Sequence, residues 1–174
     1  NTNYAIVITT NGGLWRYLIG DTVKFTSLKP FRIRITGRTK HFINAFGEEL
    51  IIDNAEKAIT HACARTNSII VDYTAAPVYF DESHNGTHEW LIEFETLPEN
   101  LEEIAFFMDT IMQDQNTYYK DLIKGKVLQT LKITSLKTDS FNNYMKSQGK
   151  LGGQNKVPRL SDNRKIADVL INQS

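Results

Sequence analysis

The 174-residue sequence predicts an α+β fold, in which a short all-β segment precedes a small domain that mixes helices and strands. Residues 4–35 contain short β-branched or alternating runs separated by Gly, Asn and Pro, a pattern typical of strands and tight turns. After Gly37 apolar residues recur every three or four positions, as on one face of a helix. A few short strands cannot close a core alone, so we expect residues 1–37 to be part of a larger sheet or barrel.

The first segment is expected to alternate short strands with turns. Asn11, Gly12 and Gly13 form the first turn, because Asn and Gly tolerate positive φ. Gly20 and Asp21 are expected at the end of the second strand. The expected strands cover residues 4–10, 14–19, 23–26 and 31–35, and the last of these has the period-2 pattern of a half-buried strand.

The second segment is expected to hold three or four helices and three or four strands. One helix begins near Ile51 with Asp53 or Asn54 as its cap, and another begins after Pro98 with glutamates in its first turn. Ser161 is expected to cap the final helix. The remaining expected elements are a hairpin at 69–80 and 88–94, a strand at 127–133 and a short helix around 141–145.

Composition narrows the function classes. Twenty basic residues balance twenty acidic ones, so bulk charge favours neither a nucleic-acid partner nor an anionic membrane surface. No apolar run approaches the roughly 18 residues of a membrane span. Cys63, the single cysteine, cannot form an internal disulfide, which favours a cytoplasmic protein. Because the first residue is Asn and a strand follows at once, we expect the sequence to be part of a longer chain.

The first cluster with chemical potential spans residues 9–21, where a glycine turn precedes Arg16, Tyr17, Gly20 and Asp21. One interpretation is an ordinary β-hairpin. The other is a nucleotide contact, because an aspartate at a strand end can accept two strong hydrogen bonds from the vicinal hydroxyls of a ribose.

The second cluster spans residues 37–50 and contains Gly37, Arg38, Thr39 and Lys40. It is either a solvated linker or an interdomain hinge. The hinge interpretation rests on its position, where the all-β pattern gives way to the mixed one.

The third cluster spans residues 149–160, a glycine-rich stretch that ends in Lys156, Pro158 and Arg159. It lacks the spacing of a P-loop, and one interpretation is a flexible loop with solvated cations. The other is that Lys156 is a mobile cation that stabilises charge developing on a phosphate or carboxylate.

No metal site is expected. The four histidines, among them His84 and His88, lack cysteine or carboxylate partners at ligand spacing. His84 and His88 flank a turn and are expected to face water.

Together the three clusters resemble motifs of the adenylate-forming superfamily, which includes firefly luciferase, acyl-CoA ligases and peptide synthetase adenylation domains. Residues 14–21 resemble its ribose-binding motif, and residues 37–50 resemble its hinge motif. The run at 9–21 and the element at 154–159 are similar to those of the auxin-responsive promoter family of acyl-acid amido synthetases. Residues 72–77 look like its bacterial members, so we expect the C-terminal portion of a bacterial member.

The resemblance implies a ligase that uses ATP with Mg²⁺ to adenylate an acyl acid, and then conjugates it to an amino acid with release of AMP and pyrophosphate. A small C-terminal domain, here residues 38–174, rotates between the two half-reactions, while residues 1–37 complete the large N-terminal domain. By motif match, Asp21, Arg38 and Tyr17 contact the nucleotide, Lys40 lies at the hinge, and Lys156 is the cation of the adenylation step.

The resemblance also implies that the phosphate loop, the acyl-acid pocket and the adenine-binding segment lie outside these residues, so the chain alone is expected to be inactive. An acyl-CoA ligase, which uses a thiol acceptor, is the alternative within enzymes. A nucleic-acid-binding β module and a purely structural lid are the alternatives outside them. The nucleic-acid interpretation rests on six cations of the β segment and hinge: Lys24, Lys29, Arg32, Arg34, Arg38 and Lys40.

Overall fold

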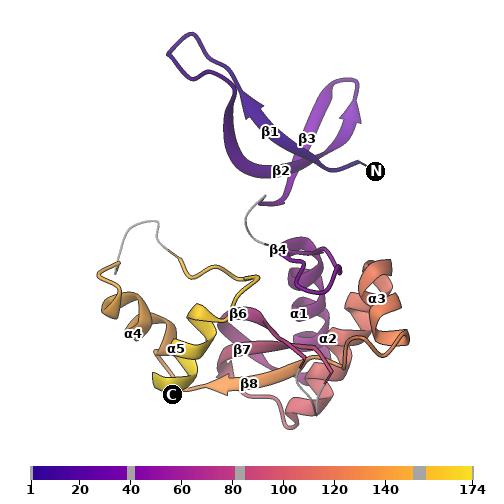
Figure 1. Cartoon of the computed structure of the whole chain (residues 1–174), viewed down its shortest axis with the longest axis vertical. Helices are drawn as coiled ribbons and strands as arrows, with labels where there is room; N and C mark the ends of the chain where they lie inside the picture. The colour runs from indigo at the N-terminus through magenta and orange to yellow at the C-terminus, as the bar shows by residue number, and fades with distance from the viewer. Residues whose placement is uncertain (1, 39–41, 81–84, 151–155, 174) are drawn as a thin grey trace.

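The computed structural model of the chain describes residues 2–38, 42–80, 85–150 and 156–173 (Figure 1). Its first three strands, β1 (Tyr4–Ile8), β2 (Tyr17–Leu28) and β3 (Phe31–Arg38), form an antiparallel sheet in the order β1-β2-β3. The turn at residues 11–13 is confirmed, since the Thr10 N–H donates to the Leu14 carbonyl at 2.8 Å.

The strand β2 corrects the prediction of two separate strands, and it places Asp21 inside a strand and not at a strand end. On β1, Val7 pairs with Leu18 and Ala5 pairs with Thr22, so β2 carries extra residues between these two pairs. Gly20 absorbs the irregularity with a φ of 93°, a conformation that costs glycine little. A glycine that looks like a strand terminator is thus a bulge within a 12-residue strand.

The sheet β1-β2-β3 leaves most of its apolar side chains exposed. Strand β3 forms as predicted, but Phe31, Ile33 and Ile35 are 77%, 53% and 65% exposed, so its apolar face is not buried by the described residues. Val23 is a buried exception among the apolar side chains that the structure describes in this sheet.

The second part begins with a short hairpin of β4 (Phe42–Ile43) and β5 (Leu50–Ile51), followed by α1 (Ile52–Thr66). The cap of α1 differs from the prediction, because the N-cap residue is Ile51. Asn54 lies three positions into the helix and its side chain accepts from the Ile51 N–H at 3.2 Å. Asp53 pairs with Lys57 across one turn of the helix.

The central sheet has the order β6-β7-β8, with β6 (Ile69–Val78) and β7 (Thr87–Thr96) antiparallel and β8 (Lys132–Leu136) parallel to β7. The hairpin β6–β7 is confirmed. Strand β8 begins later than predicted, because Leu128 and Leu131 are buried in the core without being part of the strand.

Two helices connect β7 to β8. Helix α2 (Leu101–Gln115) confirms the predicted helix after Pro98, and the structure shows Asn100 as its N-cap; helix α3 (Thr117–Lys124) was not predicted. Asn116 separates them: its N–H donates to the Met112 carbonyl at the end of α2, and its side chain accepts from the Tyr119 N–H in α3. One asparagine therefore ends one helix and begins the next.

The chain ends with α4 (Ser140–Ser147) and α5 (Lys165–Gln173). Helix α4 is confirmed, and Gly149 follows it with a φ of 64°. Helix α5 starts later than predicted, because the side chain of Asn163 accepts from the Lys165 N–H at 3.1 Å. Ser161, the expected cap, donates its N–H to β6 instead.

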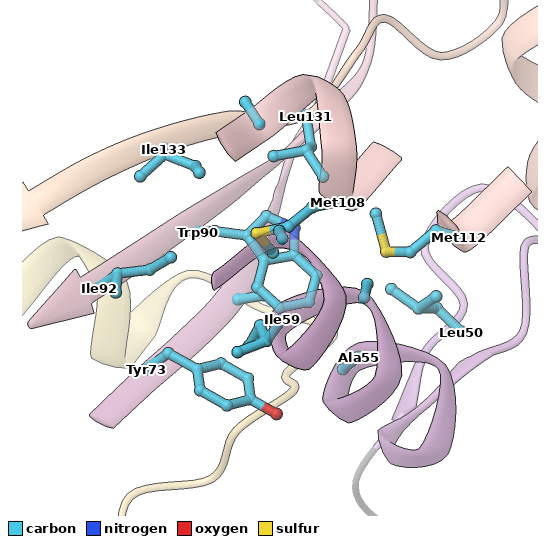
Figure 2. Close-up of a cluster of buried hydrophobic side chains, with 14 of the residues drawn as sticks. Leu50, Ala55, Ile59, Tyr73, Trp90, Ile92, Met108, Met112, Leu131 and Ile133 are labelled. Atoms are coloured by element: carbon cyan, nitrogen blue, oxygen red, sulfur yellow. The ribbon is translucent and has the colours of Figure 1, made fainter. Parts of the chain in front are cut away.

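Both faces of the sheet β6-β7-β8 are covered by helices, with one buried hydrophobic cluster on each face (Figure 1). Trp90 and Ile92 pack with α1 and α2, and Figure 2 shows Trp90 at the centre of this cluster. Leu91, which points to the opposite face, packs with residues of α4 and α5, including Phe141 and Leu170. The predicted α+β fold is confirmed.

Within the described residues, no helix combines the length and apolar character that would let it cross a lipid bilayer.

Candidate functional site

Two of the predicted nucleotide-binding residues are cross-strand partners. In the antiparallel pair of β2 and β3, Asp21 lies opposite Arg38 and Thr22 opposite Gly37. Residues directly opposite each other in such a pair have Cβ atoms about 5 Å apart. The register therefore sets the backbone positions of an acidic and a basic residue opposite each other, next to the point where the chain passes to the second part.

Tyr17, the third predicted nucleotide residue, opens β2 and lies opposite Ile8 of β1, with its side chain 53% exposed. The turn before it is strained, since Arg16 has a φ of 47° and its N–H donates to the Thr9 hydroxyl at 3.1 Å. Tyr17 thus lies on the same strand as Asp21 but beyond the irregularity at Gly20.

Lys40, the predicted hinge residue, lies outside the described residues. Its neighbour Arg38 ends β3, and Phe42 begins β4 two residues after Lys40.

Lys156 is exposed and is followed directly by residues that are fixed to the central sheet. Leu160 forms a parallel bridge with Ala75 of β6, and the Ala75 N–H donates to the Arg159 carbonyl at 2.9 Å. Val157 and Leu160 are buried. The structure therefore holds Lys156 on the second part, by elements different from those that carry Asp21 and Arg38.

A buried polar network that the sequence analysis missed holds the loop of residues 44–49. His88 is buried, not solvent-facing as expected, and its Nε2 lies 2.8 Å from Glu48 Oε1, with both side chains fully buried. The Phe46 N–H donates to Glu48 Oε2 at 2.8 Å. Burial acts to raise the pKa of Glu48, but the hydrogen bond and charge of His88 and the Phe46 N–H hold it below its ordinary value.

The same network continues into α2 and α3. Asn116 donates its side-chain N–H to the Glu48 carbonyl at 2.7 Å, and Tyr119 donates its hydroxyl to Asp109 at 2.5 Å. Tyr119 also stacks on the His88 ring, with centroids 5.7 Å apart. The loop after the expected hinge is therefore fastened to the second part by buried contacts. No sequence signal could have revealed them, because Glu48 and His88 lie 40 residues apart.

A metal site was not expected. Over the ranges that the structure describes, no three His, Cys, Asp or Glu residues gather in a way that could hold a metal ion.

Comparisons with known proteins bear on these motifs directly. The model of the GH3 family C-terminal domain matches residues 53–165, more than half of the chain, and that of the GH3 family central domain matches residues 1–38. The chain belongs to the GH3 family. It is 26% identical over 185 residues to the indole-3-acetic acid-amido synthetase GH3.10 of Arabidopsis thaliana, a match that covers 96% of this chain and 29% of that protein.

Two solved structures of GH3.15 acyl acid amido synthetase have the same fold as this GH3 chain. One, in complex with 2,4-DB, matches with a TM-score of 0.75 and 22% identity over 98% of this chain and 32% of that one. The other matches with a TM-score of 0.77 and 23% identity over the same shares. The chain thus spans about a third of the length of the relatives it matches. The Arabidopsis relative gives no support to a bacterial source, which stays a prediction.

Proposed function

We propose that the chain is the C-terminal part of an ATP-dependent acyl-acid amido synthetase. The observation that carries the proposal is the cross-strand pairing of Asp21 with Arg38, in a chain of the GH3 family. A carboxylate at this position would accept hydrogen bonds from the ribose hydroxyls of ATP, and a neighbouring guanidinium would contact the nucleotide near the ribose. Tyr17, earlier on the same strand, would shape the nucleotide pocket.

In the proposed reaction, a carboxylate oxygen of the acyl acid attacks the α-phosphorus of ATP, and pyrophosphate leaves. The amine of an amino acid then attacks the carbonyl carbon of the acyl-adenylate, AMP leaves and the amine loses a proton. Magnesium enters with ATP, held largely by phosphate oxygens. Lys156 would place its ammonium beside the charge that develops in the first step, where it binds the transition state more strongly than the ground state.

We also propose that residues 1–37 complete a larger domain and that residues 38–174 move as a unit about a hinge at Lys40. The exposed apolar side chains of β3 support the first part, because such side chains are normally buried against another element. The two-sided core of the second part supports its moving as one body. Lys156, carried on that body, would reach the nucleotide in one orientation only.

The competing functions are less well supported. A nucleic-acid interface would favour cations and aromatic rings, but β3 exposes Ile33 and Ile35 beside Phe31, which suits contact with protein better. A thioester product would need coenzyme A as acceptor, whereas the relatives are named amido synthetases. We therefore propose that the product is an amide. We also propose that the enzyme is cytoplasmic and that its partners are small molecules.

The proposal is tested by assaying the longest natural chain that contains these residues. With ATP, Mg²⁺ and a panel of acyl acids that includes indole-3-acetic acid and 2,4-DB, we expect release of pyrophosphate and, after addition of the 20 amino acids, an amide detected by mass spectrometry. Coenzyme A serves as the competing acceptor. A thioester in place of an amide, or salt-sensitive oligonucleotide binding without pyrophosphate release, would contradict the proposal. Residues 1–174 alone are expected to release no pyrophosphate.

The assigned residues are tested in the same chain. Asp21→Ala removes hydrogen bonds to a charged group worth roughly 1.5–3 kcal/mol each, so ATP binding should weaken at least about tenfold. Lys156→Ala should slow acyl-adenylate formation by about a hundredfold, while ATP affinity and aminolysis of preformed acyl-adenylate change little. If ATP affinity is unchanged in Asp21→Ala, the residue has a structural role only.

A further inference from the structure

The main chain that follows Lys156 is attached to the edge of the central sheet at several points. The Ala75 carbonyl accepts from the Ser161 N–H at 3.0 Å, which completes the bridge that starts with the Ala75 N–H and the Arg159 carbonyl. The Thr74 hydroxyl donates to the Pro158 carbonyl at 2.7 Å. These contacts fix where residues 158–161 lie, and Lys156 is two residues away from the first of them.

The side chain of Arg159 connects this segment to two other elements. One guanidinium nitrogen donates to the Glu56 carboxylate on α1, and Nε lies 3.9 Å from Asp72 Oδ1 on β6. The guanidinium carbon also lies 5.1 Å from the centroid of the Tyr73 ring, and the Tyr73 hydroxyl donates to Glu56 Oε1 at 3.2 Å. The planar, multi-donor guanidinium is suited to such a three-sided contact, and a lysine could not reproduce it.

Electrostatics and burial agree with this geometry. Burial acts to lower the pKa of the Arg159 guanidinium, but interaction with Tyr73, Glu56 and Asp72 raises it above its ordinary value. The pKa of Tyr73 is raised, mainly by burial and then by the Glu56 carboxylate, so the hydroxyl stays a proton donor. Arg159 itself is half-exposed, so the cluster lies where the sheet meets solvent, close in sequence to the exposed Lys156.

We infer that Arg159, held by Glu56 and Asp72, is a positioning residue that fixes the base from which Lys156 reaches the nucleotide. The inference rests on the proposed function of Lys156. Arg159 lies three residues after Lys156 and touches neither substrate nor phosphate in this role. It acts by limiting where the main chain at 156–159 lies, and an error of about 1 Å in placing a catalytic group can cost two orders of magnitude in rate.

The test uses single-turnover kinetics of the longest natural chain, with ATP, Mg²⁺ and whichever acid of the panel above is adenylated. Arg159→Ala should slow adenylate formation about tenfold to a hundredfold while ATP affinity and aminolysis of preformed adenylate are preserved. Arg159→Lys and Glu56→Gln, which keep part of the contact, should show smaller losses in the same step. Arg65→Ala is the matched control, because Arg65 also stacks on an aromatic ring, that of Phe107 at 4.5 Å, but contacts another helix.

A double-mutant cycle separates positioning from stability. In a Lys156→Ala background, Arg159→Ala should slow adenylation no further, because the group that it positions is already gone. An additive loss, or equal slowing of both half-reactions, would overturn the positioning role while leaving the function of Lys156 intact. If Lys156→Ala alone does not slow adenylation, both proposals are overturned. This result can be told apart from a failure of the positioning role alone.

A substrate-independent measurement completes the test. In residues 1–174, Arg159→Ala should speed hydrogen exchange of the Ala75 and Ser161 amides, which donate the two main-chain hydrogen bonds of this attachment, at least about tenfold, since local opening there becomes easier. Amides of α2 should keep their protection, and Arg65→Ala should leave both regions unchanged. Unaltered exchange of the Ala75 and Ser161 amides would show that Arg159 does not anchor the segment, and would overturn the inference without any assay of turnover.

Discussion

The sheet β1-β2-β3 and the sheet β6-β7-β8 show what one sequence pattern does and does not determine. Strands β3 and β7 both carry alternating large apolar residues, yet Ile33 and Ile35 are exposed whereas Trp90 and Ile92 are completely buried. The second sheet has helices packed on both faces, and the first has no such cover within the described residues. Periodicity therefore predicts which side chains need a partner surface, and only the rest of the chain determines what supplies it.

The largest effect that would test this difference concerns the buried Glu48–His88 pair of the second part. Glu48→Ala leaves the buried His88 ring and the Phe46 N–H without their partner, so we expect a loss of about 3–5 kcal/mol in unfolding free energy. Asp53→Asn, which affects the exposed pair with Lys57, should cost at most about 0.5 kcal/mol. Urea unfolding followed by circular dichroism measures both. Similar losses for the two variants would contradict the structure.

Two isoleucines compare the surroundings of the two sheets: Ile104 on α2, in the core that covers β6-β7-β8, and Ile35 on β3. Ile104→Ala empties space in a closed core and should cost about 2–5 kcal/mol in residues 1–174. Ile35→Ala, at 65% exposure, should cost no more than about 0.5 kcal/mol there. In the longer natural chain the cost of Ile35→Ala should rise if another part of the protein covers β3. An equal, small cost in both chains would contradict the proposal that residues 1–37 complete a larger domain.

A smaller effect is expected from two glycines, one in each part. A Cβ at Gly86 would lie 2.6 Å from the Phe46 ring, so Gly86→Ala should cost about 1–3 kcal/mol by overpacking. A Cβ at Gly12 would meet no atom closer than 3.7 Å, so Gly12→Ala should be close to neutral. Thermal unfolding of the two variants, measured side by side, checks this prediction. Equal shifts would mean that Phe46 is free to move away.

The pH dependence of stability should come mainly from the second part. The pKa of Glu48 is lowered despite burial, by His88, and that of Glu89 is lowered despite burial, by Thr134 and Arg164. A lowered folded-state pKa gives stability that is present above the unfolded value of 4.5 and is lost as pH falls through the folded value. Unfolding free energy should therefore fall steeply with acidification below about pH 4.5. Glu89→Gln should make that slope shallower, and an unchanged slope would contradict it.

Local patterns were enough to predict much of the second part. Helices α1 and α2 and the hairpin β6–β7 follow from apolar spacing and from the polar, turn-favouring sequence between the two strands, all of which act within a few residues of the chain. Helix α3 was missed because Asn116 interrupts the pattern with a cap shared between two helices. The predicted range of strand β8 began too early, because the apolar residues before the strand are buried in the core without being part of it.

The candidate site was less predictable, since its geometry depends on contacts between distant residues. The residue types at Asp21 and Lys156 indicated ribose or phosphate chemistry, and the motif match assigned Arg38 to the nucleotide, but the pairing of Asp21 with Arg38 requires the register of β2 and β3. His88 was expected in water, because its partner Glu48 lies far upstream and its strand position gives no sign of that partner. The sequence indicates Arg159 only as part of a motif, and its contacts with α1 and β6 appear only in three dimensions.

The attachment of residues 159–161 to β6 has a further consequence for how the chain behaves in concentrated solution. Strand β6 is the edge of its sheet, and an open edge is a template on which another copy can add a strand and aggregate. Here the N–H and carbonyl of Ala75 are occupied by Arg159 and Ser161, Pro77 has no N–H to offer, and its carbonyl accepts from Arg164 at 3.3 Å. The outer edge of β6 therefore resists intermolecular strand pairing for as long as the C-terminal segment stays in place.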